Sequence, residues 1–185
     1  EFIPEEYKGC ENIILSVGRL SEQKGFDSAI SAASKLNKKC LKFKWFIIGS
    51  GPLKDKLNDQ IEKENVKDYV ELLGTKSNPY PYIKNCDIFV QPSRYEGKSV
   101  VIDEAKILAK PIVATAYPTV KDQIQNENEG IIVELNVDGI VNGIVALCSD
   151  NVKKQQIVAY LEKQEYGNQN EVKKYINLIE GKMKI

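Results

Sequence analysis

Hydrophobic and polar positions alternate in blocks along this chain. Short apolar runs rich in β-branched and aromatic residues alternate with stretches in which apolar residues recur three or four positions apart. The runs are typical of strands buried on both faces, and the spaced stretches are typical of amphipathic helices. The predicted strands are residues 12–17, 44–48, 69–73, 87–91, 111–115 and 130–134. The predicted helices are residues 26–36, 52–63, 80–85, 100–109, 120–125, 137–148, 151–164 and 172–182.

The alternation of strand and helix, repeated about six times, predicts the fold class. It indicates an α/β protein: a Rossmann-like three-layer sandwich with a six-stranded parallel sheet and helices on both faces. Because ligands of such sheets bind at the carboxyl ends of the strands, we expect the chemistry in the loops after strands one, two, four and five. The chain of 185 residues contains no linker-like segment, so we expect a single domain, 1–185.

Composition narrows the function classes. Lys plus Arg and Asp plus Glu both number 26, so bulk charge predicts no nucleic-acid partner. No apolar run is long enough for a membrane span, and we expect neither a span nor a signal peptide. Four cysteines without C-x-x-C spacing and the absence of histidine predict no metal site. We therefore expect a cytoplasmic protein without a structural disulfide.

The loop after the first predicted strand carries two cations. Its sequence, GRLSEQKG, holds Gly18, Arg19, Lys24 and Gly25 and leads into a predicted helix. A helix N-terminus with two nearby cations is a suitable anion site. The alternative is that Arg19 and Lys24 are solvated loop cations. The loop lacks the Walker phosphate-binding pattern.

The turn after the second predicted strand holds Gly49 and Gly51. These glycines would let a ligand lie against the backbone, or would simply make a tight turn. Lys54 stands where a third glycine would complete the dinucleotide fingerprint, which disfavours NAD binding.

Two carboxylates follow the fourth predicted strand. On one continuous helix Glu96 and Glu104 would not share a face, so we expect Glu96 in the loop and Glu104 one turn into the helix. Both could then reach one pocket. Carboxylates beside a phosphate would repel it, so they suit hydroxyl groups of a ribose or sugar. The alternative is a solvated Glu96 and a Glu104 that interacts only with the helix dipole.

Four motifs in fixed order carry a family resemblance. They are S-V-G-R-L-x-x-x-K-G, I-I-G-S-G-P, P-S-x-x-E-G-x-x-x-V-x-x-E-A and K-P-I-V-A-T, and they lie within residues 10–150. This set resembles the C-terminal, donor-binding domain of GT-B glycosyltransferases of the retaining group 4 type, the glycosyl transferases group 1 family. The resemblance implies transfer of a sugar from a nucleotide diphosphate-sugar to an acceptor hydroxyl, in polysaccharide or glycoconjugate synthesis.

The resemblance also implies roles for individual residues. Arg19 and Lys24 would neutralise the donor diphosphate and Glu96 would face the donor sugar; these three form the catalytic set. Glu104 would bind the ribose. The donor would be a UDP- or GDP-type sugar, with no cofactor and no metal ion. The donor-binding set is Gly18, Gly49, Gly51, Gly74, Thr75, Lys76, Gly97, Lys98, Ser99, Val100 and Glu104.

The resemblance covers one of the two domains of a GT-B enzyme. It implies that an acceptor glycan or lipid-linked glycan binds through an N-terminal domain outside this chain, and that residues 165–185 form a helix packing toward that domain. We expect the chain alone to bind donor without turnover, and the whole protein to lie peripherally at the inner membrane face. Lys98 and Ser99 depart from the family pattern. The alternatives are a non-catalytic nucleotide-sugar module and another GT-B enzyme such as an epimerase.

Overall fold

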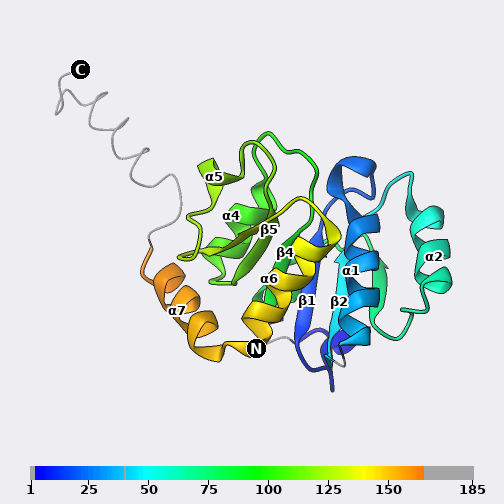
Figure 1. Ribbon diagram of the computed structural model, residues 1–185, viewed down its shortest axis with the longest axis horizontal. Helices are drawn as coiled ribbons and strands as arrows, with labels where there is room; N and C mark the ends of the chain where they lie inside the picture. Colours follow the sequence, from blue (N-terminus) through cyan, green and yellow to red (C-terminus); the bar gives the residue numbers. More distant parts are fainter. Residues whose placement is uncertain (1–2, 40, 165–185) are drawn as a thin grey trace.

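The structure, a computed structural model, describes residues 3–39 and 41–164. It contains a six-stranded parallel sheet with strand order β3-β2-β1-β4-β5-β6 (Figure 1), which confirms the predicted fold class. The strands are β1 Ile13–Val17, β2 Lys44–Ile48, β3 Val70–Gly74, β4 Ile88–Gln91, β5 Ile112–Thr115 and β6 Gly130–Val133. The helix predicted at 172–182 lies outside the described residues.

Every helix predicted within the described residues is present. The helices are α1 Phe26–Lys38, α2 Lys54–Lys63, α3 Tyr80–Asn85, α4 Val100–Ile107, α5 Val120–Gln123, α6 Val137–Ser149 and α7 Asn151–Glu162. Two 3-10 helices, η1 Glu5–Tyr7 and η2 Glu22–Lys24, were not predicted. Helix α4 ends before the predicted residue 109, because Ala109 adopts a left-handed backbone with φ of 52°.

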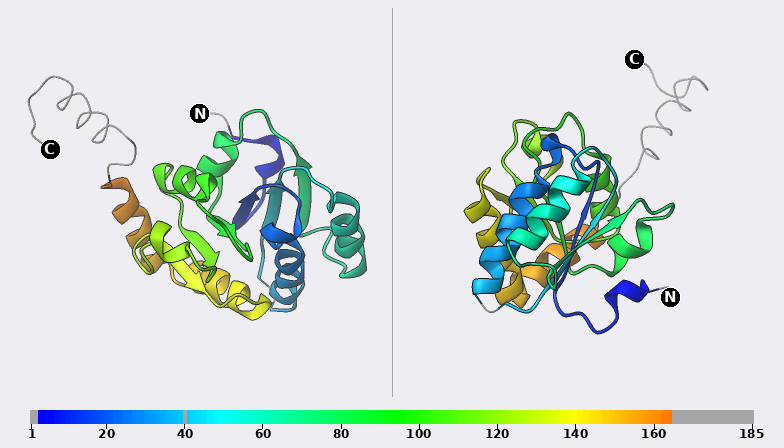
Figure 2. Two further views of the ribbon diagram at one scale, coloured as in Figure 1. Left: turned by 90° about the horizontal axis from the view of Figure 1, so that it is seen from above. Right: turned by 90° about the vertical axis from the view of Figure 1, so that its right-hand side faces the viewer.

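Alternate side chains of each strand enter two separate hydrophobic cores, one on each face of the sheet. On β1, Ile14 packs into the core beneath α1, α2 and α6, whereas Leu15 packs into the core beneath α3, α4 and α5. Figures 1 and 2 show the resulting three layers. Burial on both faces explains why the strands are continuous apolar runs in the sequence.

The order of the strands fixes where a ligand can bind. Strand β1 pairs with β2 on one side and with β4 on the other, so the chain's winding direction reverses between β1 and β4. In doubly wound sheets, ligands bind beside the loops that leave the two strands at such a switch point. The loops that carry Arg19, Lys24 and Glu96 are these two loops.

Two glycines allow the loop after β1 to lie against its neighbours. Gly49 has φ of 150°, and a Cβ atom there would lie 1.8 Å from the carbonyl oxygen of Gly18. Gly25 has φ of 65°, and a Cβ atom there would lie 2.1 Å from the carbonyl oxygen of Pro92. A larger residue at either position would separate the loops.

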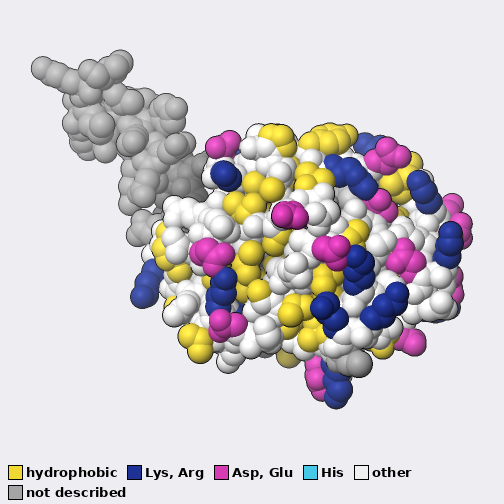
Figure 3. Space-filling model, viewed as in Figure 1, with side chains coloured by type: hydrophobic (Ala, Val, Ile, Leu, Met, Phe, Trp, Pro, Cys, Tyr) yellow, Lys and Arg dark blue, Asp and Glu magenta, His cyan; other side chains and the backbone are white. Residues whose placement is uncertain are grey.

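Charges of both signs are interspersed on the face seen in Figure 3, without an extended patch of one sign. This distribution agrees with the zero net charge. In the described part of the chain, no helix combines the length and hydrophobicity needed to cross a membrane.

Candidate functional site

A cavity of about 470 Å³ opens at the carboxyl ends of β1, β2 and β3. Its walls are residues 17–19 after β1, residues 48–51 after β2, and Thr75, Lys76 and Pro79 after β3. The cavity thus brings together six residues predicted from the sequence to bind a donor: Gly18, Arg19, Gly49, Gly51, Thr75 and Lys76. Gly74, the last residue of β3, directly precedes this wall.

Arg19 is the exposed cation of this cavity. Within residues 3–39 and 41–164, its guanidinium has no hydrogen-bond or ion-pair partner. An unpaired guanidinium on a backbone-lined wall is available for two parallel hydrogen bonds to a phosphate.

Lys24 and Glu96 form an ion pair across the switch point. The distance from Lys24 Nζ to Glu96 Oε1 is 2.7 Å, and the two side chains are 16% and 6% exposed. Lys24 belongs to the loop after β1 and Glu96 to the loop after β4, as expected. The alternative of a solvated Glu96 is excluded, since its carboxylate is enclosed by protein.

Three further side chains donate to the Glu96 carboxylate. Gln91 Nε2 and Ser93 Oγ lie 2.8 and 2.6 Å from Oε1, and Gln23 Nε2 lies 3.2 Å from Oε2. The hydroxyl of Thr115, at the end of β5, donates to the carbonyl oxygen of Ser93 at 2.5 Å. This network joins β4, β5 and η2 and fixes the orientation of Glu96.

Glu104 occupies the fifth position of α4, as its spacing from Glu96 predicts, but it has a different neighbour. Its Oε1 accepts a hydrogen bond of 3.2 Å from the hydroxyl of Tyr80 on α3. Glu96 faces the β1 loop and Glu104 faces α3, so in this structure the two carboxylates have no common partner among the described residues.

The N-terminus of α4 has fewer available donors than the sequence suggests. The backbone N–H of Ser99 donates to Gln123 Oε1 at 2.9 Å, and Gln123 Nε2 donates back to the Ser99 carbonyl oxygen. The ammonium of Lys98 lies 3.7 Å from Asp103. Gly97 and Val100 remain exposed. An anion at the N-terminus of α4 would therefore bind the N–H groups of residues beside Ser99 rather than that of Ser99 itself.

Lys76 is paired with a carboxylate of the N-terminal segment. Its Nζ lies 2.8 Å from Glu6 Oε1 and 5.1 Å from the centre of the Tyr82 ring. The hydrogen bond to Lys76 lowers the pKa of Glu6, and the same bond raises the pKa of Lys76. Lys76 also lines a neighbouring cavity of about 430 Å³ together with Tyr82. Its charge is already balanced, unlike that of Arg19.

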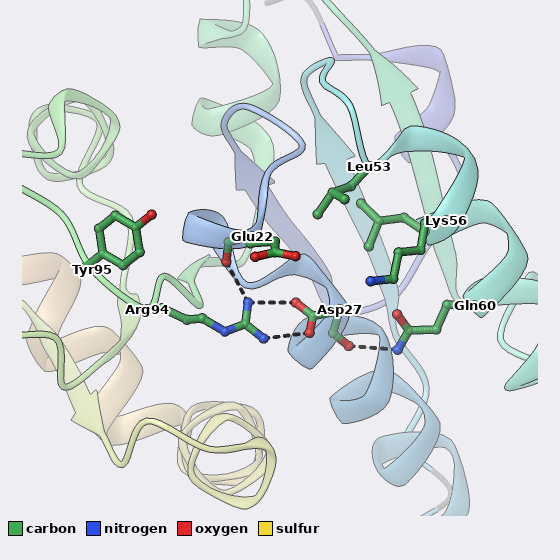
Figure 4. Close-up of a pocket in the computed structure, with 8 residues that line it drawn as sticks. Glu22, Asp27, Leu53, Lys56, Gln60, Arg94 and Tyr95 are labelled. Carbon is green, nitrogen blue, oxygen red and sulfur yellow. Dashed lines mark hydrogen bonds and ion pairs between the residues drawn. The ribbon is translucent and has the colours of Figure 1, made fainter.

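A second group of residues fixes the loop after β4 from its other side (Figure 4). Arg94 makes two hydrogen bonds to Asp27 on α1, of 2.9 and 2.6 Å, and a third of 2.6 Å to the carbonyl oxygen of Glu22. Burial tends to raise the pKa of Asp27, but the hydrogen bond and charge of Arg94 outweigh it and lower this pKa. These residues line a cavity of about 330 Å³ that shares no wall residue with the first.

Among the residues that the structure describes, no group of three or more His, Cys, Asp or Glu side chains is placed to hold a metal ion.

Sequence reasoning missed several residues that shape the site. Gln91 and Ser93 are polar residues at the end of an apolar strand, which is a signal for a site at the sheet edge. Tyr80 lies in the N-P-Y-P-Y segment, where an aromatic residue between two prolines is a weaker signal.

The sequence profile described as "Glycosyl transferases group 1" matches residues 2–164. The chain belongs to the glycosyl transferases group 1 family. One relative is the Campylobacter jejuni N-acetylgalactosamine-N,N'-diacetylbacillosaminyl-diphospho-undecaprenol 4-alpha-N-acetylgalactosaminyltransferase, to which the chain is 32% identical over 143 residues. The aligned residues cover 76% of this chain and 38% of that enzyme.

Solved structures of this family have the same fold. A mutant of Staphylococcus aureus TarM, in complex with Fondaparinux, alpha-GlcNAc-glycerol and UDP, superposes with a TM-score of 0.82 at 26% identity. The match covers 96% of this chain and 37% of TarM. The C-terminal domain of the Francisella tularensis group 1 protein LpcC superposes with a TM-score of 0.72 at 22% identity, over 85% and 86% of the two chains.

The LpcC match spans most of both chains, so the two share the same fold. The chain spans between 26% and 40% of the length of eight curated relatives that it matches. The chain is therefore the size of a C-terminal domain of a GT-B glycosyltransferase.

Proposed function

We propose that this chain is the donor-binding half of a retaining glycosyltransferase, which moves a sugar from a nucleotide diphosphate-sugar to an acceptor hydroxyl. The observation that carries the proposal is the cavity at the ends of β1, β2 and β3, where Arg19, unpaired among the described residues, lies beside the backbone of three glycines. This position, beside the switch point of the sheet, is where doubly wound folds bind nucleotides.

Each part of the donor has a chemically suitable neighbour in this proposal. The diphosphate lies between Arg19 and the N-terminus of α4, with Lys24 close by. The ribose hydroxyls donate to Glu104, and the transferred sugar lies next to Glu96. The base occupies the wall formed by Gly74, Thr75 and Lys76. In this arrangement Arg19 is a cation without a carboxylate partner among the described residues, whereas Lys24 is paired with Glu96.

The chemistry follows from these positions. The bond between the anomeric carbon and the diphosphate oxygen breaks, and negative charge grows on the leaving oxygens. Lys24, which Glu96 holds in place before the reaction, and Arg19 would stabilise that charge. Oε2 of Glu96, which accepts one hydrogen bond in the structure, would accept another from a sugar hydroxyl while the acceptor hydroxyl attacks. The developing diphosphate charge would assist removal of the acceptor proton.

We assign a UDP-type donor and an acceptor that is a glycan or lipid-linked glycan. The TarM structure that contains UDP supports the nucleotide, and the undecaprenol-linked substrate in the name of the Campylobacter relative supports the acceptor class. The acceptor would bind through the second domain of the whole protein, at the inner face of the membrane. The chain alone would bind donor but not turn it over.

Calorimetry on the 185-residue chain with UDP, GDP and their sugars tests the proposal. We expect saturable binding of one nucleotide series, weakened about tenfold or more by Arg19→Met because a charged hydrogen bond contributes about 1.5–3 kcal/mol. Lys38→Met removes the same charge from the exposed end of α1 and should leave the affinity unchanged. Absence of binding by all nucleotides would contradict the proposal.

A further inference from the structure

Tyr80 connects helix α4 to the rim of the cavity at the ends of β1, β2 and β3, which we call the nucleotide cavity. It is the first residue of α3 and directly follows Pro79, a wall residue of the cavity. Its ring is 51% exposed, yet its hydroxyl donates to Glu104 Oε1 at 3.2 Å. A half-exposed tyrosine needs no protein partner for its hydroxyl, because water can serve. The bond therefore matters chiefly for what it does to Glu104.

Glu104 has few other restraints. In the described part of the chain, the Tyr80 hydroxyl is the one hydrogen-bond partner of its carboxylate. A glutamate side chain loses about 1.5–2 kcal/mol of rotamer entropy when it is fixed, and that loss opposes ligand binding. Tyr80 occupies Oε1 and leaves Oε2 with its lone pairs for a ligand hydroxyl.

The backbone around Tyr80 is stiff. Pro79 and Pro81 flank it, and each fixes its own φ angle. The Tyr80 N–H donates to Asn78 Oδ1 at 3.1 Å, and the Asn85 amide donates to the Pro81 carbonyl oxygen at 2.8 Å. The hydroxyl of Tyr80 is thus presented to α4 from a short, rigid helix rather than from a loose loop.

We propose that Tyr80 is a positioning residue that holds the Glu104 carboxylate ready for the ribose diol of a nucleoside diphosphate, and so sharpens discrimination between ribose and deoxyribose. The inference rests on the proposed function, since it needs a nucleotide in the cavity. A tyrosine hydroxyl is protonated at neutral pH and can therefore donate, and the hydrogen bond to Glu104 raises the pKa of Tyr80 further.

The experiment measures the affinity of Tyr80→Phe for UDP and for 2′,3′-dideoxy-UDP by calorimetry on the full 185-residue chain. Phenylalanine keeps the ring and removes only the hydroxyl. We expect UDP affinity to fall about three- to tenfold, as expected for the loss of one hydrogen bond. The affinity for 2′,3′-dideoxy-UDP should not change, because that ligand has no ribose hydroxyls to donate hydrogen bonds to Glu104.

Tyr160→Phe is the matched control. The Tyr160 hydroxyl on α7 also donates to a side-chain oxygen, Gln125 Oε1 at 2.7 Å. Unlike Tyr80, which follows Pro79, Tyr160 has no wall residue of the nucleotide cavity next to it in the sequence. It should leave both affinities unchanged. Glu104→Gln should reduce the ribose preference at least as much as Tyr80→Phe does.

The outcomes separate this inference from the proposed function. If wild-type chain binds UDP and Tyr80→Phe binds it equally well, or loses UDP and the dideoxy analogue alike, the Tyr80 inference is wrong and the proposed function stands. If wild-type chain binds no nucleotide, both are wrong.

Discussion

The ion pair between Lys24 and Glu96 allows a quantitative test of the site's construction. Glu96→Gln keeps the shape of the side chain but removes the charge that balances Lys24, which is only 16% exposed. Breaking one side of a buried ion pair costs about 3–5 kcal/mol of folding free energy. Because Lys24 retains some access to water, we expect about 3 kcal/mol.

The opposite change should cost less. Lys24→Met leaves Glu96 with Gln91, Ser93 and Gln23 as hydrogen-bond donors. The loss is then one charged hydrogen bond, about 1.5–3 kcal/mol. The double variant has no unpaired charge, so its cost should be smaller than the sum of the single costs by about 1 kcal/mol or more.

Urea unfolding measures these differences. Trp45 is the one tryptophan of the sequence and is fully buried, so its fluorescence reports global unfolding. Glu5→Gln is the control: its pair with Lys8 is exposed, and exposed pairs contribute about 0–1 kcal/mol. Additive single costs, within about 0.5 kcal/mol, would refute the coupling and show that Lys24 and Glu96 do not act as a unit.

Two further predictions concern stability. Gly49→Ala should lower the free energy of unfolding by several kcal/mol, because the added Cβ atom would overlap the Gly18 carbonyl oxygen. Gly97→Ala is the control: the space around its Cβ position is open, so it should cost less than about 1 kcal/mol. Equal urea midpoints for the two variants would contradict this prediction. The pKa of Asp27 is lowered in the folded state, so its charge stabilises the fold above the ordinary aspartate pKa, and this effect is lost as pH falls through the range near and below about 4. The stability difference between wild type and Asp27→Asn should therefore shrink over that range. A difference that is constant with pH would show that Asp27 does not interact with Arg94 through its charge.

The fold was largely predictable from the sequence. Because each strand is covered on both faces, its apolar run is unbroken, and the helices between them carry a clear 3.6-residue spacing. The exceptions are local. The short η2 helix has no apolar periodicity, and the end of α4 depends on the left-handed backbone of Ala109, which carries no sequence signal.

The site was predictable only in part. The placement of Glu96 in a loop and Glu104 in a helix follows from strand length and spacing. Their partners do not, because Lys24 is 72 residues from Glu96 and Tyr80 is 24 residues from Glu104 along the chain. Such contacts depend on the order of the strands in the sheet. The alternation of strands and helices along the sequence predicts a parallel sheet but does not determine which strands are neighbours. Arg94 and Asp27, 67 residues apart, meet for the same reason.

Calorimetric titration of the purified 185-residue chain with UDP, GDP and their sugars tests the central claim most directly. The account predicts saturable, one-to-one binding that weakens with added salt and with Arg19→Met, because a cation meets the diphosphate. Heats equal to those of dilution for every nucleotide and nucleotide sugar would contradict it.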